Sequence, residues 1–258
     1  MDKLNKLPLV SVVMPAYNGA RFIEAAIRSV MAQTMPEWEL LVLDDGSADD
    51  TCAIAEGLAA EDARIRLLPN EENMGVARTR NRGISLCRGR YVAFLDCDDC
   101  WLPHKLELQL ERMGQTGAGL CYCSYGIMDQ HGERSRRDYL VPETVDLKGL
   151  LRENVIGCST VVLDLEQLGD VRFRTDFYHE DYVLWLTLLQ EGCLAAGCPE
   201  VLARWRLVEN SRSFNKIHAA KSRWNIFRKC MGMSVGESLA AMVPYMLAGL
   251  RKYSRKES

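Results

Sequence analysis

Features that would indicate a membrane-spanning or exported protein are missing from this 258-residue sequence. Residues 1–8 are polar and lack the apolar core of a secretory signal, and no apolar run reaches the roughly 18–20 residues that cross a bilayer. A formal net charge of -3 gives no reason to expect a nucleic-acid partner. Ten cysteines without an export signal suggest a reducing compartment. We therefore expect an intracellular, cytoplasmic protein.

Two common nucleotide-binding motifs are absent as well. No G-x-G-x-x-G follows the first predicted strand, which argues against a dehydrogenase, and no G-x-x-x-x-G-K-[ST] occurs, which argues against a P-loop enzyme. The segment after that strand, Pro15-Ala16-Tyr17-Asn18-Gly19, also lacks the Gly-rich, basic loop usual in sugar-phosphate nucleotidyltransferases. The nucleotidyltransferase class stays open as an alternative.

Hydrophobic spacing predicts alternating strands and helices in the first part of the chain. Nearly continuous apolar runs predict buried strands at residues 9–14, 38–43, 65–68 and 90–95, and helical spacing predicts helices at 20–33, 50–60 and 76–87. Further along, we expect a helix at 103–113, strands at 119–125 and 159–163, and a helix at 177–190. Such alternation implies right-handed crossovers, so the sequence predicts one α/β domain with a mainly parallel, doubly wound sheet.

Three polar clusters follow predicted strands directly. They are Pro15-Ala16-Tyr17-Asn18, Asp44-Asp45-Gly46-Ser47 and Asp96-Cys97-Asp98-Asp99. Ligands of parallel sheets bind beyond the carboxyl ends of the strands. We therefore expect the three clusters to meet in one binding site.

The third cluster has the pattern of a metal-binding loop. Side chains two residues apart in an extended segment point the same way, so Asp96 and Asp98 can face a cation while Asp99 turns aside. Two carboxylates completed by phosphate oxygens suit Mg²⁺ or Mn²⁺. Alternatively, these aspartates cap the helix after Pro103 or lie in a solvated turn.

Cys97 and Cys100 raise the separate possibility of zinc. A structural zinc site needs about two more ligands, and Cys121 with Cys123 is the candidate pair. Those two residues have strand spacing, so burial on one face of a sheet is the simpler interpretation.

Together, these segments resemble the family 2 glycosyltransferases with the GT-A fold. The likeness rests on residues 11–18, 44–47 and 94–99, on the Asn-x-Gly…Ala-Arg segment at 73–81, and on Glu180-Asp181 followed by Trp185. It covers about the first 190 residues in the correct order. The resemblance implies a nucleotide-binding half and an acceptor-binding half, with a nucleotide-sugar as donor.

The same resemblance implies roles for particular residues. Pro15, Ala16 and Tyr17 would line the nucleotide pocket, Asp45 would hydrogen-bond the base (most simply uracil), Asp96 would contact the donor, and Asp98 would bind the metal. Asp181 would be the general base of an inverting transfer, and Arg78 or Arg80 would face the diphosphate. Each residue has an ordinary alternative: turn capping for Asp44 or Asp45, packing for Tyr17, solvated helix charge for the arginines, and a helix start for Glu180 and Asp181.

The C-terminal segment differs from the rest in charge. Residues 216–258 contain nine Lys or Arg and two Asp or Glu, a net charge of +7, so the preceding part carries -10. We expect a catalytic domain at 1–210 and a basic helical extension at 211–258. The extension either contacts an anionic membrane or packs on the catalytic domain as a helical cap.

The segment Ser211-Arg212-Ser213 resembles a loop of bacterial envelope-polysaccharide members of the family. That loop would close over the donor, although ordinary loop chemistry explains it equally well. The basic charge and aromatic residues of the extension would place the protein on the cytoplasmic face of the inner membrane, and a glycan or lipid-linked saccharide as acceptor would explain such an extension. A non-catalytic protein that binds nucleotide-sugars or glycans is the alternative from another class.

Overall fold

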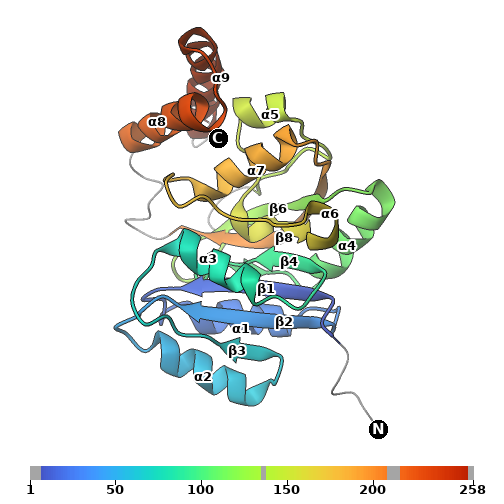
Figure 1. The fold of residues 1–258 in the computed structure, drawn as a ribbon. Coiled ribbons are helices and arrows are strands. Elements are labelled where there is room, and N and C mark those ends of the chain that lie inside the picture. Colours follow the sequence, from blue (N-terminus) through green and yellow to red (C-terminus); the bar gives the residue numbers. More distant parts are fainter. Residues whose placement is uncertain (1–6, 135–137, 208–215, 255–258) are drawn as a thin grey trace.

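An eight-stranded mixed sheet forms the centre of the protein, and helices cover both of its faces (Figure 1). The computed structural model describes residues 7–134, 138–207 and 216–254, without the side chains of 216–218 and 245–254. The strands are β1 (Val10–Ala16), β2 (Trp38–Asp44), β3 (Ile65–Leu67), β4 (Tyr91–Phe94), β5 (Cys100–Trp101), β6 (Leu120–Met128), β7 (Val162–Asp164) and β8 (Ala195–Arg206). Their order across the sheet is β3-β2-β1-β4-β7-β6-β8-β5.

The helices connect these strands or follow the last of them. They are α1 (Ile23–Met31), α2 (Thr51–Glu61), α3 (Val76–Ser85), α4 (Lys105–Thr116), α5 (Leu147–Arg152), α6 (Leu165–Leu168), α7 (Glu180–Gln190), α8 (Lys216–Asn225) and α9 (Val235–Ser254), with a 3-10 turn η1 (Cys158–Thr160) and a π-helical segment η3 (Ile226–Cys230). α1, α2 and α4 pack on one face of the sheet around Ile27 and Leu106, and α3, α5 and α7 pack on the other around Ile84 and Trp185. The sheet is therefore covered on both sides, as the sequence predicts.

The first half of the sheet is parallel and confirms the predicted strands. β1 pairs in parallel with β2 on one side and with β4 on the other, and β2 pairs in parallel with β3. The register places Ala16 beside Asp44 and Val13 beside Phe94. Because these strands run in the same direction, the loops that follow β1, β2 and β4 all lie at one edge of the sheet.

The second half of the sheet is mixed. β7 runs antiparallel to β4 and β6, β5 runs antiparallel to β8, and β6 runs parallel to β8. β7 begins at Val162, later than predicted, because residues 158–160 form the turn η1. The sequence does not indicate β8, since Pro199 and Glu200 interrupt its apolar residues, and its register with β6 shifts at Ser124.

Helix α3 lies very close to β1. A Cβ atom at Gly83 would come within 2.5 Å of Val13 Cγ1, so a larger residue would displace the helix. This docking turns one face of α3 inward. Thr79 and Arg80 are buried on that face, whereas Arg78 is exposed.

The basic C-terminal segment packs on the second half of the molecule, at the top of Figure 1. Ile226 and Phe227 of η3 are buried, and the guanidinium of Arg223 lies 3.9 Å from the centroid of the Tyr182 ring in α7. α9 contacts α5. The segment therefore forms a helical cap. The expected domain boundary at 210 and the loop at 211–213 lie outside the described residues.

None of the helices in the described part of the chain combines the length and apolar character needed to cross a membrane.

Lys105, at the start of α4, is fully buried. Its Nζ atom lies 4.0 Å from the centroid of the Trp101 ring and has no hydrogen-bond partner among the described residues. Burial lowers the pKa of Lys105 to about 8, because loss of water disfavours the charged amine. Since the folded-state pKa lies below the unfolded value of 10.5, the lysine costs stability below about pH 8. This destabilisation shrinks as the pH rises from about 8 to 10.5, because the amine then loses its charge in the unfolded state as well.

Replacing Lys105 with Met should stabilise the protein at pH 7 by on the order of 3 kcal/mol, because the buried amine is removed while the packing volume is kept. The gain should shrink as the pH rises from about 8 to 10.5. Urea unfolding of both proteins across this range measures the difference. Lys148→Met on the exposed side of α5 is the control and should change stability by less than about 0.5 kcal/mol. A gain in stability that does not vary with pH would contradict the lowered pKa of Lys105.

Candidate active site

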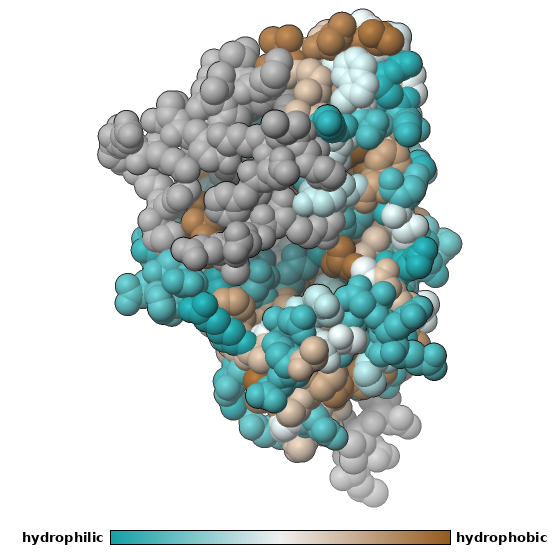
Figure 2. Space-filling model, turned by 90° about the vertical axis from the view of Figure 1, so that its left-hand side faces the viewer, coloured by the Kyte–Doolittle hydropathy of each residue, from teal (hydrophilic) through white to brown (hydrophobic). Residues whose placement is uncertain are grey.

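A cavity of about 530 Å³ opens at the edge of the sheet where β1, β2 and β4 end. Most of its walls come from the loops that follow these three strands and from the start of α3. The lining residues are Pro15, Ala16, Tyr17, Asn18, Gly19, Phe22, Asp45, Asn73, Gly75, Val76, Arg80, Asp96, Cys97 and Asp98. Figure 2 looks onto this side of the molecule, where hydrophilic residues dominate the middle of the surface. The expectation that the three polar clusters meet in one place is confirmed.

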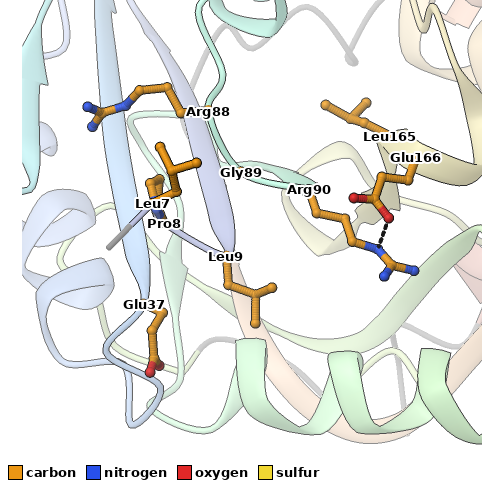
Figure 3. Close-up of a pocket in the computed structure, with 9 residues that line it drawn as sticks. All are labelled: Leu7, Pro8, Leu9, Glu37, Arg88, Gly89, Arg90, Leu165 and Glu166. Carbon is orange, nitrogen blue, oxygen red and sulfur yellow. Dashed lines mark ion pairs between the residues drawn. The ribbon is translucent and has the colours of Figure 1, made fainter. Parts of the chain in front are cut away.

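A larger cavity, of about 620 Å³, lies at the opposite end of the sheet (Figure 3). Its arginines already have partners: Arg88 pairs with the buried carboxylate of Glu39, and Arg90 pairs with Asp164 and Glu166. The strand-end clusters do not contribute to it. We therefore place the candidate site in the smaller cavity, where the predicted residues converge.

The loop Asp96–Asp99 is held by residues far away in the sequence. The buried carboxylate of Asp99 accepts hydrogen bonds from Ser159 Oγ at 2.6 Å and from the backbone N–H of Arg206 at 2.9 Å. The side chain of Arg206 donates to the carbonyl of Asp98 at 2.7 Å. Asp99 thus turns aside, as expected, and anchors the loop.

Asp96 and Asp98 line the cavity from the acidic loop, and Asp45 lines it from the side of β2. Burial and the nearby Asp96 carboxylate raise the pKa of Asp98 to about 6, although Arg206 and Arg80 oppose the shift. Asp96 also accepts a hydrogen bond from Arg80 Nη2 at 2.6 Å. Two adjacent carboxylates at a cavity wall fit a divalent cation that completes its coordination with phosphate oxygens and water.

Protein side chains alone do not assemble a full metal cage in the described residues, where no group of three or more His, Cys, Asp or Glu gathers. Cys121 and Cys123 are buried in the sheet, as the strand spacing predicts, and Cys121 Sγ lies 3.8 Å from Cys198 Sγ. Cys97 also lines the cavity, but burial raises the pKa of its thiol to about 12, so the charged donors there are carboxylate oxygens, which Mg²⁺ and Mn²⁺ prefer over the thiolates that zinc favours.

Asp45 shapes the wall of the cavity on the side of β2. Its Oδ1 atom accepts hydrogen bonds from Asn70 Nδ2 at 2.7 Å and from the N–H of Met74 at 2.9 Å, and its Oδ2 accepts from the N–H of Gly75 at 2.9 Å. Asp45 thus holds the segment before α3. Its neighbour Asp44 accepts from the N–H of Ser47 at 3.0 Å and caps the turn, while the base-binding role of Asp45 stays a prediction.

Residues at the end of β1 form the other wall. Pro15 and Ala16 belong to the strand, and Tyr17 follows it with 53% of its surface exposed. A packed role for the Tyr17 ring is therefore excluded, and the ring lies at the mouth of the cavity. Asn18 adopts a left-handed conformation, with φ of 49°, and its amide oxygen accepts from the N–H of Ala48 at 2.8 Å.

Arg80 lines the cavity, whereas Arg78 is exposed and does not. Arg80 Nη1 donates to Glu180 at 2.7 Å, while Nη2 bonds Asp96. The sequence offers both arginines and favours Arg78 as the donor contact, whereas the residue that lines the cavity is Arg80. The sequence gives no signal for Ser159 or Arg206. These residues lie 60 and 107 residues after Asp99 in the chain, in the turn η1 and at the end of β8, and they support the acidic loop.

Asp181 lies at the start of α7, as expected, beside the buried Glu180. Its Oδ1 atom accepts from the N–H of Tyr182 at 2.7 Å. Burial raises the pKa of Asp181 and the charge of Asp96 adds to this, while Arg80 acts in the opposite direction. A half-buried carboxylate with a raised pKa is a stronger base than a solvated one, which suits general-base chemistry near neutral pH.

Curated relatives match the chain over nearly its whole length. TuaG of Bacillus subtilis (strain 168), a glycosyltransferase assigned by name to teichuronic acid biosynthesis, is 38% identical over 248 residues, covering 96% of this chain and 98% of that protein. The UDP-Glc:alpha-D-GlcNAc-diphosphoundecaprenol beta-1,3-glucosyltransferase WfgD of Escherichia coli is 37% identical, with 95% of both chains covered.

Solved structures share the fold at lower sequence identity. TarS 1-349 of S. aureus in complex with UDP-GlcNAc has a TM-score of 0.73 and 17% identity, covering 92% of this chain and 71% of that one. The mannosyltransferase PcManGT of Pyrobaculum calidifontis, in complex with GDP-Man and Mn2+, has a TM-score of 0.68 and 20% identity, covering 98% of this chain and 77% of that one. The family model of Glycosyl transferase family 2 matches residues 11–162. With its GT-A-type α/β sheet and its strand-end cavity, this chain belongs to glycosyl transferase family 2.

Proposed function

We propose that the protein is an inverting glycosyltransferase. It moves a sugar from a UDP-sugar to a hydroxyl of a glycan or lipid-linked acceptor in cell-envelope polysaccharide synthesis. The observation that carries this proposal is the meeting of Asp96, Asp98 and Arg80 at one cavity, where Arg80 also bonds Glu180 at the start of α7. The relatives named for teichuronic acid and for a diphosphoundecaprenol-linked sugar support the envelope context.

The donor would lie in the cavity formed by the ends of β1 and β2. Pro15, Ala16 and Tyr17 would line the nucleotide. Asp45 would face the base, because its carboxylate keeps acceptor capacity beyond the three hydrogen bonds that it accepts from the protein. Uracil fits because its imide N–H can donate to a carboxylate. UDP-containing donors in the name of WfgD and in the TarS complex support this choice. Contact of Arg78 with the diphosphate stays a prediction from the sequence.

Asp98 would hold Mn²⁺ or Mg²⁺, with Asp96 beside it facing the donor. Bound there, the cation would neutralise charge on the departing nucleoside diphosphate as a Lewis acid. Asp181 would accept the proton of the acceptor hydroxyl while the hydroxyl oxygen bonds to the anomeric carbon and UDP leaves. One such displacement inverts the configuration at that carbon.

Calorimetry should show UDP binding that depends on Mn²⁺ and is selective over GDP and dTDP, because Asp45 reads the base and Asp98 holds the cation. Asp98→Ala should abolish the metal-dependent part of binding. Asp50→Ala is a control, since this exposed side chain makes no cap hydrogen bond at α2. Preference for another nucleotide would refute the uracil assignment, and unchanged binding by Asp98→Ala would refute the metal site.

Replacing Asp181 with Asn should lower turnover by roughly 10²-fold or more while UDP affinity changes little, since the amide cannot take the acceptor proton. Steady-state turnover of a UDP-sugar and calorimetry with UDP measure the two quantities. Asp176→Asn, at an exposed position just before α7, is the control. Near-normal turnover of the Asp181 variant would remove that residue from the mechanism.

We further propose that the C-terminal helices touch an anionic membrane from the outer side of the cap. Val235, Leu239 and Val243 repeat every four residues on one face of α9 and are 53%, 56% and 52% exposed. Apolar residues gather at this upper end of the molecule in Figure 2. Lys221 and Lys229 are exposed on the neighbouring helical segments, and the whole segment carries a net charge of +7. An apolar face beside basic charge suits an anionic lipid surface.

Liposome flotation should show stronger binding to vesicles containing anionic lipid than to neutral vesicles. The variant Leu239→Glu/Val243→Glu should lose most of this binding, because it places two acids on the apolar face of α9. Leu194→Glu is the matched control, since Leu194 is 61% exposed in the turn between α7 and β8. Equal binding to both kinds of vesicle, or equal loss in the control, would count against this contact.

A further inference from the structure

Arg80 joins the two halves of the active site. It lies on α3, and its buried guanidinium bonds Asp96 through Nη2 at 2.6 Å and Glu180 through Nη1 at 2.7 Å. Asp96 follows β4 on the donor side of the site, and Glu180 is the first residue of α7. The bridge therefore connects segments that are 84 residues apart in the sequence (180 - 96) through one side chain.

The residue after Arg80 makes a second connection of the same kind. Asn81 Nδ2 donates to the carbonyl of Phe173 at 2.8 Å, and Asn81 Oδ1 accepts from the N–H of Phe173 at 2.7 Å. The Arg80 guanidinium also lies 5.3 Å from the centroid of the Phe173 ring. α3 thus fixes both ends of the segment 173–180, which leads directly into Asp181.

The bridge uses the particular geometry of arginine. Its fork presents two nitrogens to two different carboxylates, which a lysine ammonium on a flexible stem cannot reproduce in the same arrangement. Glu180 is 7% exposed, so its charge needs a partner in place. Each terminal nitrogen already bonds one carboxylate, so the fork is engaged in holding Asp96 and Glu180, while Nε has no hydrogen-bond partner among the described residues.

We propose that Arg80 is a positioning residue that holds the first turn of α7, and with it Asp181, against the donor-side carboxylate Asp96. Removing the fork leaves α7 free to shift, which moves the base away from the acceptor hydroxyl. Small displacements of a reacting group are costly to turnover, whereas the nucleotide end of the site lies on β1 and β2 and stays in place. This inference rests on the proposed role of Asp181.

The test compares Arg80→Lys, which keeps the charge but loses the fork, with Arg90→Gln. Arg90 is the matched control because it also pairs with a buried carboxylate, Asp164, but at the amino end of β4. We expect Arg80→Lys to lower kcat by roughly 10- to 100-fold, with UDP affinity within about 3-fold of wild type. Arg90→Gln should keep its kcat even where its melting temperature falls.

A double-mutant cycle separates positioning from a direct role. On an Asp181→Asn background, Arg80→Lys should lower the remaining kcat by less than about 3-fold, because the base it positions is already gone. Full additivity would overturn the proposal. A large loss of UDP affinity with unchanged kcat would also overturn it and make Arg80 a donor ligand.

Hydrogen exchange gives a readout that needs no turnover. Amides in residues 173–181 should exchange faster in Arg80→Lys than in wild type or Arg90→Gln, because the start of α7 loses its anchor. Unchanged exchange in this segment would overturn the proposal. If exchange rises but wild type transfers no sugar from any UDP-sugar, the proposed function fails while the positioning role of Arg80 stands.

Discussion

Parallel pairing of β1 with β2 on one side and β4 on the other is the constraint on which the active site depends. Parallel strands end at the same edge, so the loops after Ala16, Asp44 and Phe94 must meet there. Each loop carries polar residues that would be costly to bury inside the sheet. The sheet thus concentrates carboxylates, a tyrosine and backbone N–H groups around one cavity without any special long-range contact.

Long-range contacts then decide how that edge is arranged. Arg206, at the end of β8, bonds the backbone of the acidic loop, and Ser159 bonds Asp99. Arg80 ties the loop to α7. Burying several charges is unfavourable unless each has a partner, and here each of these buried groups has one. Tyr17 is exposed where it lines the cavity, and Asp98 lines the cavity wall.

The second half of the sheet gives the molecule its asymmetry. β7 reverses direction beside β4, and β6 and β8 extend the sheet away from β1 and β2. α7 and the C-terminal helices cover this half, and Arg223 packs on Tyr182 of α7. The basic segment therefore has an inner face that stabilises the second half and an outer face on α9 that exposes apolar residues. The two alternatives of helical cap and membrane contact are compatible, because the packing residues lie on α8 and η3 while the exposed apolar residues lie on α9.

Local sequence patterns determine much of this protein. The strands β1, β2 and β4 follow from continuous apolar runs, and the loop clusters follow from the polar residues at their ends, since both signals lie within a few neighbouring residues. β8 could not be predicted, because Pro199 and Glu200 break its pattern and its pairing with β6 stabilises it. The choice between Arg78 and Arg80 was also beyond the sequence. Two residues along a helix differ by about 200° in direction, so one must face inward and the other outward. Which of them faces inward was decided by the tertiary structure alone, when Gly83 allowed α3 to dock on Val13.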